Sequence, residues 1–368
     1  MTKDIPEQML AAQVIEFNQP YKVHQVPTPK NLGPKDVLVK IAVASFCHTD
    51  SMVAKGIMKS QLPITGSHEG SGTVVAVGSE VTKFKEGDRV MCGIPYQPCG
   101  QCVDCKGPEK YRQYCVNVGG LKGVTSDGYF AEYAVVDEEF SVKLPDEVSF
   151  ETAAPLACAG ITVWRAVLAS ELNAGQWLAI VGSGGGLGHL CIQFAKARGL
   201  KVIGIDARDE GLVLSKKSGA DVVIDARRGD EEVLKEVQRV TGETQGAEVT
   251  ITLTEAKNAS AMACAVTKMH GKMIQVAQPD NVIIPFRELV FRDIRIVGTL
   301  ISSPAEAEKM LDAVAKNKIT VATNRFDGLD KLPELTELAH SGKMSGKAQI
   351  IVDQEQIKRQ RKSGLELV

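Results

Sequence analysis

The 368-residue chain lacks an excess of charge of either sign and lacks a long apolar run free of polar residues. Its 43 Lys and Arg residues nearly balance 45 Asp and Glu residues, for a formal net charge of -2, so the composition shows no bias toward nucleic acid or anionic membranes. The uncharged stretch 172–195 contains glycines and polar residues that make it poor material for a membrane-spanning helix. We therefore expect no nucleic-acid partner and no membrane span, which favours small-molecule chemistry.

Targeting signals and a disulfide framework are also missing. The first six residues lack the basic start and apolar run of a signal peptide, and the last four are not a peroxisomal address. The nine cysteines lie mostly at metal-ligand spacings, which is typical of a reducing compartment. We expect a cytoplasmic protein with two domains, because its length exceeds the usual limit of a single core. The basic run 358–362 is expected to be a solvated end.

The stretch from Ser45 to Asp50 carries chemistry, because Cys47 offers a thiolate, His48 an imidazole and Thr49 a hydroxyl. His68 follows 21 residues after Cys47, and Cys158 lies much later in the chain. Two sulfurs and one nitrogen suit zinc, and three protein ligands leave the fourth tetrahedral position open, as in a catalytic site. The plain alternative is that Cys158, within an apolar run, is a core residue.

A second metal candidate is the loop Cys99-x2-Cys102-x2-Cys105-x9-Cys115. Three thiolates at regular spacing beside polar residues are hard to explain by core packing. Four sulfurs would close a tetrahedral shell, so we expect a structural zinc that stabilises this loop. Cys92 is left over as a spare.

The middle of the chain predicts a nucleotide-binding βα unit. A buried strand at 178–181 leads into a glycine-rich turn at 182–188 and an amphipathic helix at 189–198. A second strand at 201–205 ends on Asp206, 18 residues after Gly188, where a carboxylate that binds the adenosine ribose is expected. Backbone amides of the turn would face a pyrophosphate, so the cofactor-binding candidates here are Gly182, Gly184, Gly185, Gly186, Leu187, Gly188 and Asp206.

Strand patterns flank this unit on both sides. The N-terminal part predicts a β-rich domain with strands at 10–17, 36–43, 72–77, 89–91 and 129–136. Beyond Asp206, strands at 221–224, 248–253, 272–276 and 293–297 alternate with helical stretches such as 231–240. This alternation predicts a doubly wound parallel sheet.

Four motifs resemble the zinc-dependent medium-chain alcohol dehydrogenases, particularly their yeast-type branch of fungal and bacterial enzymes. They are Cys47-His48-Thr49-Asp50, Gly66-x-His68-Glu69-Gly70, Lys85-x-Gly87-Asp88-Arg89-Val90 and Pro155-Leu156-x-Cys158-Ala159-Gly160-Ile161-Thr162-Val163. The resemblance implies an α/β fold, with a Rossmann domain and a discontinuous, β-rich, GroES-like catalytic domain. The implied boundaries are residues 1–163 for the first catalytic part, 164–300 for the NAD-binding domain and 301–368 for the returning catalytic part.

The resemblance also implies roles for individual residues. Cys47, His68 and Cys158 would bind the catalytic zinc, with Glu69 close enough to exchange onto it. Thr49 would hydrogen-bond the substrate oxygen, and Asp50 would orient His68. The remaining cofactor contacts implied are His48 and Lys347 near the pyrophosphate, Thr162 at the nicotinamide, and Val276 and Arg208 elsewhere on the nucleotide.

The chain departs from the family at positions that affect mechanism and substrate. Met52 stands where the yeast-type enzymes carry a proton-relay histidine, and a thioether does not titrate. Met58 and Ile94 replace bulky tryptophans of small-alcohol enzymes, which allows a larger or differently shaped substrate. The family's cysteine loop has seven residues before its last cysteine, whereas this chain has nine, so Cys115 is the least secure ligand.

We therefore expect an enzyme that oxidises an alcohol reversibly with NAD, as a homotetramer or homodimer. A zinc-free reductase or a non-catalytic dinucleotide-binding protein would leave the three zinc ligands unexplained. An NADP-dependent aldehyde reductase of the cinnamyl type is the nearer alternative, because Arg208 could offset the repulsion between Asp206 and a 2′-phosphate.

Overall fold

The computed structural model describes residues 5–362, 364 and 365, except for the side chain of Glu243. The terminal residues on which the expectation about targeting signals largely rests, 1–4 and 366–368, lie outside this part of the chain. The described chain forms two compact units. Unit 1 comprises residues 1–158, 302–316 and 323–368, and unit 2 comprises residues 159–301 and 317–322.

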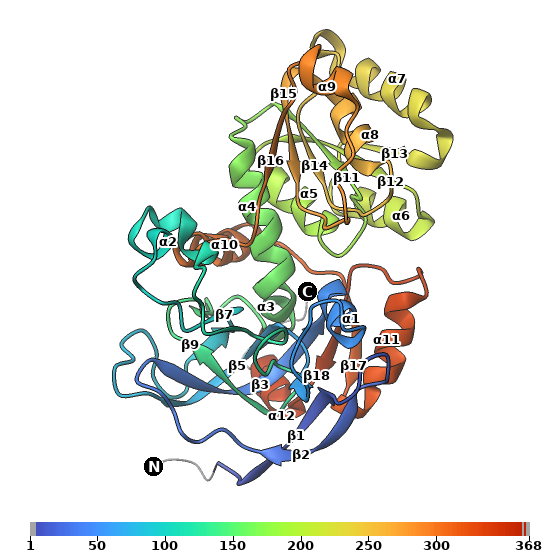
Figure 1. Ribbon diagram of the computed structural model, residues 1–368. Helices are drawn as coiled ribbons and strands as arrows, with labels where there is room; N and C mark the ends of the chain where they lie inside the picture. Colours follow the sequence, from blue (N-terminus) through green and yellow to red (C-terminus); the bar gives the residue numbers. More distant parts are fainter. Residues whose placement is uncertain (1–4, 363, 366–368) are drawn as a thin grey trace. The chain divides into compact units, whose positions relative to one another are not determined.

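Unit 1 is built mainly from short strands (Figure 1). Its N-terminal elements are β1 (Gln8–Val14), β2 (Lys22–Pro27), β3 (Asp36–Phe46), α1 (His48–Ala54), β4 (Ile64–Thr65), β5 (Glu69–Val77), β6 (Arg89–Met91), β7 (Pro95–Tyr96), α2 (Val103–Lys106), a 3₁₀ helix (Glu109–Tyr114), β8 (Gly120–Leu121), β9 (Tyr133–Asp137), β10 (Val142–Lys143) and α3 (Phe150–Pro155). Its returning part contains α10 (Pro304–Asn317), β17 (Thr323–Asp327), a 3₁₀ helix (Leu329–Lys331), α11 (Leu332–His340), β18 (Lys347–Ile351) and α12 (Gln354–Lys362).

The long strand β3 organises the main sheet of unit 1. The strand order is β10-β6-β5-β3-β18-β17, and β9 also pairs with β3. β3 pairs antiparallel with β5, β9 and β18, and ten of its eleven residues are buried. A strand buried on both faces reads as a nearly continuous apolar run, as this one does. Its C-terminal end, Phe46, leads directly into the Cys47 motif.

The expected strand at 129–136 is wrong in its first four residues. Only Tyr133–Asp137 forms β9. The N–H groups of Gly128, Tyr129 and Phe130 instead donate to the carbonyls of residues 65–67, at 2.9–3.0 Å. These backbone bonds support the loop that carries His68 rather than a sheet.

Unit 2 alternates strands and helices, as expected. Its elements are a π-helical turn shared with unit 1 (Leu156–Gly160), α4 (Ile161–Ser170), β11 (Trp177–Val181), α5 (Gly188–Ala197), β12 (Lys201–Asp206), α6 (Asp209–Lys217), β13 (Val222–Asp225), a 3₁₀ helix (Ala226–Arg228), α7 (Asp230–Thr241), a 3₁₀ turn (Gly242–Thr244), β14 (Ala247–Thr252), α8 (Ala259–Val266), β15 (Thr267–Gln275), α9 (Phe286–Val290) and β16 (Arg295–Gly298). The strands form one parallel sheet in the order β13-β12-β11-β14-β15-β16 (Figure 1).

Side-chain alternation along β11 buries both faces of this sheet. Ala179 and Val181 belong to an apolar cluster that includes Val233 and Val237 of α7 and side chains of α8. Because successive residues of a strand point to opposite faces, Leu178 and Ile180 face the other side, where α5 contacts the sheet. Unit 2 is therefore the doubly wound, Rossmann-like domain that the alternating sequence predicts.

One helical stretch, Phe150–Ser170, is long and apolar enough to cross a membrane by length and composition. However, 72% of its most apolar window is buried within the protein, as in the core helix of a soluble domain. The stretch 172–195, examined above for the same reason, forms β11, the glycine turn and most of α5.

The basic run 358–362 forms the end of helix α12 and is not a separate tail. Its four charged residues are exposed, as expected. The uncharged residue among them, Gln360, is buried; it accepts the Phe150 N–H at 2.8 Å and donates to Glu151 at 2.9 Å. This helix therefore closes onto the start of α3.

Candidate active site

Four potential metal ligands converge in unit 1. One donor atom each from Cys47, His68, Glu69 and Cys158 lies within 4.8 Å of the others. Cys47 lies at the start of α1, His68 and Glu69 are adjacent at the start of β5, and Cys158 lies in the π-helical turn, so three separate pieces of backbone assemble the group. Cys158 is therefore part of this group and not only a core residue.

A single buried carboxylate joins two of these pieces. Asp50 accepts the Cys47 N–H at 2.7 Å through Oδ2 and the Ser67 N–H at 3.0 Å through Oδ1. The same Oδ1 atom lies 3.7 Å from Nδ1 of His68, which is too long for a hydrogen bond. Asp50 thus positions the N-terminus of α1 and the His68 loop together.

Cys158 owes its position to an irregular helix. Pro155, the last residue of α3, lacks the N–H group that would continue the regular hydrogen-bond pattern. The following residues, Leu156–Gly160, form a π-helical turn with Cys158 at its centre. Such turns are frequent at functional sites, because the extra residue per turn redirects side chains.

Glycine in the His68 motif has a packing reason. A Cβ atom at Gly70 would lie 2.6 Å from the ring of the fully buried Tyr129. Any larger residue would displace either the ring or β5, which begins one residue earlier at Glu69. Gly70 therefore keeps Glu69 close to the other donors.

The acids, thiols and imidazole of the group have shifted pKa values, and a metal ion would compete with protons for them. Burial raises the pKa of Asp50 to about 6 and that of Glu69 to about 7. Burial alone would lower the pKa of His68, but Asp50 and Cys47 raise it to about 9. A hydrogen bond from Cys158 lowers the pKa of Cys47 well below its usual value, so the two sulfurs share one proton. Metal binding would displace these protons, because the ligands must be deprotonated.

Lys347 forms an ion pair with Glu69 that the sequence did not suggest. Lys347 is buried, and its Nζ donates to Glu69 Oε1 at 2.8 Å; the implied contact with a pyrophosphate stays a prediction. Glu69 and Cys47 raise its pKa, against the effect of burial. Lys347 therefore supplies a fixed positive charge beside the potential ligands.

The donor set fits a zinc ion. Among the described residues, the buried Oε2 atom of Glu69 has no hydrogen-bond partner, while His68 Nδ1 faces Asp50. Two thiolates and one imidazole are preferred zinc ligands, and orphaned polar atoms in a buried site require a partner. The group therefore has both the chemistry and an unsatisfied atom of a metal site.

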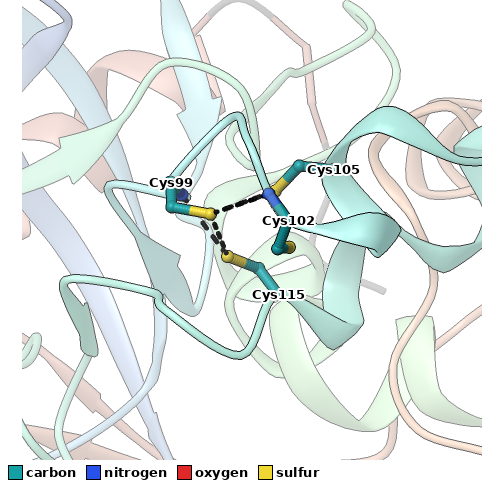
Figure 2. Close-up of side chains that lie close together, drawn as sticks. All are labelled: Cys99, Cys102, Cys105 and Cys115. Atoms are coloured by element: carbon teal, nitrogen blue, oxygen red, sulfur yellow. Dashed lines mark hydrogen bonds between the residues drawn. The ribbon is translucent and has the colours of Figure 1, made fainter.

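The second cysteine group also assembles. The sulfurs of Cys99, Cys102, Cys105 and Cys115 lie within 4.8 Å of one another (Figure 2). Backbone donors already favour thiolates here, since the N–H groups of Gln101 and Cys102 lower the pKa of Cys99 to about 6. The two extra residues before Cys115 do not prevent convergence, because the 3₁₀ helix Glu109–Tyr114 compacts this part of the loop.

The cysteine loop is also tied to the returning chain of unit 1. Glu109 accepts the Ser303 hydroxyl at 2.7 Å and the Ala305 N–H at 2.8 Å, at the start of α10. A carboxylate at a helix N-terminus satisfies otherwise unpaired N–H groups and interacts favourably with the helix dipole.

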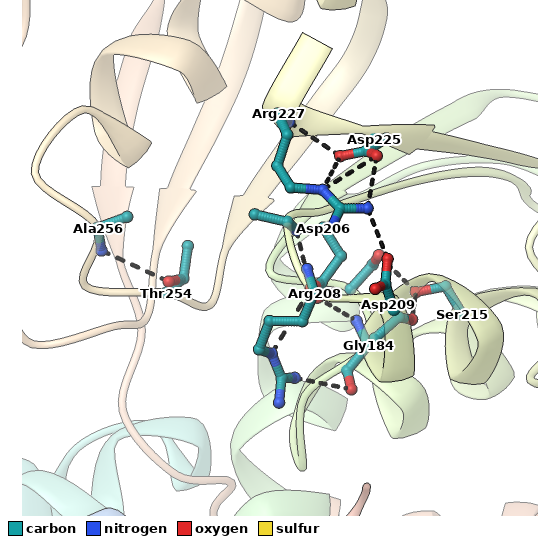
Figure 3. Close-up of polar contacts among 12 residues, drawn as sticks. Gly184, Asp206, Arg208, Asp209, Ser215, Asp225, Arg227, Thr254 and Ala256 are labelled. Carbon is teal, nitrogen blue, oxygen red and sulfur yellow. Dashed lines mark hydrogen bonds and ion pairs between the residues drawn. The ribbon is translucent and has the colours of Figure 1, made fainter. Parts of the chain in front are cut away.

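In unit 2, Asp206 lies where the sequence predicted, as the buried last residue of β12. Its Oδ2 accepts the Gly184 N–H at 2.8 Å, and its Oδ1 accepts the N–H groups of Ala207 at 2.9 Å and Arg208 at 3.0 Å (Figure 3). A Cβ atom at Gly184 would lie 2.0 Å from the carbonyl oxygen of Gly211, so only glycine allows the turn to approach α6 this closely.

A cavity of about 460 Å³ adjoins this carboxylate, within the size range of small-molecule sites. It is lined by Gly182 and Gly185 of the turn, by Asp206 and Arg208, and by Arg227 and Asp230 beyond β13. The sequence did not single out Arg227. Its signal was available, because residues that follow successive parallel strands gather at one edge of the sheet.

The other candidate residues are divided between the two units. In unit 1, His48 is exposed, Thr49 is half-buried and its Oγ1 lies 3.9 Å from Cys47 Sγ, and Met52 is half-buried on α1. In unit 2, Thr162 is half-buried on α4, Gly186 and Leu187 lie in the turn, Gly188 begins α5, and Val276 follows β15. Met58 packs partly buried on a small cluster of unit 1, and Ile94 is buried.

A histidine does lie next to helix α1, although it comes from a distant part of the chain. His340 Nε2, at the end of α11, is 2.8 Å from the hydroxyl of Ser51, which precedes Met52. Local sequence patterns do not reveal this pairing, because 289 residues separate the partners.

Comparison with known proteins finds a family match in each of the two units. Residues 33–146 match the family model of the alcohol dehydrogenase GroES-like domain, and residues 186–316 match that of the zinc-binding dehydrogenases. An alcohol dehydrogenase of Rhizobium meliloti (strain 1021) is 35% identical over 350 residues, covering 94% of this chain and 98% of the relative. One from Geobacillus stearothermophilus is 34% identical over 351 residues, covering 94% and 100%.

A solved structure gives the same result for the fold. The crystal structure of the alcohol dehydrogenase from the hyperthermophilic archaeon Aeropyrum pernix is similar with a TM-score of 0.84 at 30% identity, covering 93% of this chain and 99% of that one. Zinc and a nucleotide are the cofactors of this fold, consistent with the two metal groups and the Asp206 cavity. On this evidence the chain belongs to the zinc-dependent medium-chain alcohol dehydrogenases.

Proposed function

We propose that this protein catalyses the reversible oxidation of a primary or secondary alcohol to an aldehyde or ketone, with hydride transfer to NAD. The observation that carries the proposal is the convergence of Cys47, His68 and Cys158 in a member of this family. Two sulfurs and one nitrogen fill three tetrahedral positions and leave one for substrate. We assign the metal chemistry to unit 1 and nucleotide binding to unit 2.

Each residue around the metal group has a defined task in this proposal. Zinc supplies Lewis-acid chemistry, and a nicotinamide supplies the hydride acceptor. Asp50 holds the loop that carries His68 by accepting the Ser67 N–H, and its negative charge lies beside the imidazole, with Oδ1 3.7 Å from Nδ1. Glu69 is an alternative ligand. When its carboxylate does not bind the metal, Lys347 neutralises its charge.

Thr49 is the residue to which we assign the substrate proton. Its hydroxyl lies beside the Cys47 sulfur and can both accept and donate a hydrogen bond. Met52 cannot carry that proton onward because a thioether does not titrate, so we propose His48, which is exposed on the same helix, as the residue that would pass the proton to water. The assignment of the chain to the yeast-type branch stays a prediction.

NAD is the cofactor that the Asp206 cavity favours. The carboxylate would accept a hydrogen bond from the ribose hydroxyl and would repel a 2′-phosphate. Two arginines line the same cavity and favour the NADP alternative, but Arg227 is already bound to Asp225 at 2.7 Å and to Asp209 at 2.7 Å (Figure 3). Arg208 approaches Asp206 itself at 3.7 Å. The positive charge available to a phosphate is thereby reduced.

We also propose a second, structural zinc at the four cysteines and a cytoplasmic location. Six of the nine cysteines belong to the two metal groups, and all nine are free thiols. Metal-binding thiolates are stable in a reducing compartment.

A homo-oligomer is supported by an exposed apolar surface on unit 2. Exposed side chains are Val282, Ile283, Phe286, Leu289, Val290, Phe291, Val297 and Leu300. They surround α9 and β16, and β16 is the edge strand of the sheet. An apolar edge of this kind is normally covered, and a second copy related by a two-fold axis can cover it with the same surface.

The activity is tested by following reduced nicotinamide during incubation with short aliphatic, branched, benzylic and hydroxymethyl-heteroaromatic alcohols, and with the matching aldehydes. We expect turnover only when zinc is bound. A protein that reduces a quinone or an enoyl substrate without zinc, and none of these alcohols or aldehydes, contradicts the proposal.

The choice of cofactor is tested on kcat/KM for NAD and for NADP. The wild type should prefer NAD, and Asp206→Ala should narrow or reverse the preference. The double variant Asp209→Asn/Asp225→Asn should also improve the use of NADP, because it frees Arg227 to meet a phosphate. A wild type that prefers NADP overturns this assignment.

A further inference from the structure

A second cavity of unit 1 contains none of the metal-group residues. It has a volume of about 490 Å³ and lies beside β1, β2 and β9. Its walls are largely apolar, with Met9, Val26, Pro63, Ala131 and Val135 among them. The polar side chains of the lining are Gln13, Thr65, Tyr96, Lys122, Ser126, Asp127 and Tyr133.

Lys122 is a buried cation that lies beside an aromatic ring. Its side chain is only 5% exposed, and its ammonium lies 5.0 Å from the ring centre of Tyr96. Among the described residues, its Nζ forms neither an ion pair within 4.0 Å nor a hydrogen bond. Ser126, which lines the same cavity, has a buried hydroxyl without a hydrogen-bond partner.

The nearby acids are committed to other donors. Asp127 lines the cavity but is exposed, and it accepts the Thr65 N–H at 2.8 Å. Asp36 accepts the Tyr96 hydroxyl at 3.0 Å and the Gly33 N–H at 2.7 Å. Neither carboxylate is close enough to pair with the lysine, so the ammonium keeps three donors for another partner.

Burying an unpaired charge is unfavourable, and buried charges in proteins are normally paired. A ligand with one negative group and an apolar body would satisfy both parts of this cavity. We propose that the cavity around Lys122 binds a small carboxylate with an apolar chain or ring, whose carboxylate pairs with the Lys122 ammonium. The site is separate from the alcohol and nucleotide sites and does not depend on the proposed function.

The charge state of Lys122 gives the site a pH dependence. Burial lowers the pKa of its ammonium to about 8, and Asp127, Cys92 and Asp36 oppose this only in part. An anion that binds the charged form must bind less well as the pH rises through this value. Binding should therefore be strong at pH 7 and weak at pH 9.

The test uses hexanoate as the probe, hexanamide as its neutral analogue and inorganic phosphate as an anion without an apolar body. Isothermal titration calorimetry on the zinc-loaded protein should show hexanoate binding and neither of the other two. In Lys122→Met, which keeps the length of the side chain but removes the charge, hexanoate should bind roughly ten- to a hundred-fold more weakly. Lys343→Met, at an exposed lysine of the same unit, is the matched control and should bind as the wild type does.

Hexanoate that binds at the catalytic metal would still bind in Lys122→Met. Only the binding that is lost in this variant is therefore assigned to the Lys122 cavity. The variant should fold, because it removes a buried charge, and its thermal midpoint without ligand should equal or exceed that of the wild type. Hexanoate should raise the midpoint of the wild type but raise it less in the variant. Equal hexanoate affinity in the two proteins, equal affinity at pH 7 and pH 9, or binding of hexanamide as tight as hexanoate overturns the proposal.

Discussion

Single residues of the metal group have different supports in the fold. Cys47 lies at the N-terminus of α1, His68 is in a loop held by Asp50, and Cys158 is in a π-helical turn. Asp50 joins the first two supports, and it stays in place when a ligand is replaced, so removing one ligand should leave the other pieces in place. The effect on metal binding can therefore be separated from unfolding.

Cys47→Ala and His68→Ala should each abolish turnover and lose about one zinc per subunit, because each removes one of three ligands at an open site. Metal content and alcohol oxidation are measured on the same samples. Cys92→Ala is the control, since Cys92 is buried in unit 1 but belongs to neither metal group. Full activity with unchanged zinc in either ligand variant would refute the metal triad.

Lys347→Met should lower stability by roughly 3–5 kcal/mol, because it leaves the buried Glu69 carboxylate without its counter-ion. Adding Glu69→Gln should restore part of this loss, since the uncompensated charge is then removed. Denaturant unfolding of the two single variants and the double variant measures the coupling. Strictly additive losses would show that the two side chains do not interact.

Residue types and motifs were enough to predict that Cys47, His68, Glu69 and Cys158 come together and that Asp206 ends the second strand of unit 2. They were not enough for the ion pair of Glu69 with Lys347, whose partners are 278 residues apart. That contact depends on β18 pairing with β3, in the register that places Ala348 beside Phe46. Strand pairing at this separation is a property of the fold, and local patterns do not contain it.

At the scale of elements, the cysteine loop has little apolar core of its own. Its helices are short, and only Cys105, Gln113 and Cys115 are buried between residues 99 and 116. A metal at the four sulfurs would therefore contribute most of its stability.

Cys102→Ser should lower the thermal midpoint by several degrees while leaving the catalytic zinc bound, because the closed shell loses one ligand. Differential scanning calorimetry and metal analysis check this, again with Cys92→Ala as control. The proposal of a structural zinc is wrong if Cys102→Ser has the same thermal midpoint as the wild type and the wild type binds only one zinc per subunit.

The cysteine loop and the segment 129–132 both depend on contacts that local sequence patterns do not reveal. The spacing before Cys115 departed from the family, and the sequence could not reveal that a 3₁₀ helix brings this sulfur to the others. The alternating pattern at 129–132 suggested a strand, but the N–H groups of Tyr129 and Phe130 donate to carbonyls of the loop that precedes His68. In both places the outcome depends on contacts between segments.

At the scale of the whole molecule, the exposed apolar surface around α9 and β16 should decide the subunit count. Phe286→Glu combined with Phe291→Glu should reduce the molecular mass measured by light scattering, because charges on both copies would face each other across a two-fold interface. Ile15→Glu, at an exposed apolar residue of unit 1, should have no such effect. A wild type that is already a monomer contradicts the oligomer.

The division into two units was predicted in outline. The change from short alternating strands to alternating strands and helices marks unit 2, whereas the return of the chain to unit 1 was implied only by the family resemblance. The strands of that return, β17 and β18, are five residues each and carry no motif. Their place is set by pairing with β3 and with each other.

The contact of Glu109 with the start of α10 has a consequence for redox chemistry. The thiolates that suit a metal are also the groups that oxidants attack first. Oxidation of the cysteine loop would disorder Glu109 and withdraw the acceptors of Ser303 and Ala305, which lie 194 and 196 residues further along the chain. Oxidative damage to the exposed loop would then weaken the hydrogen bonds at the start of α10, where the chain re-enters unit 1.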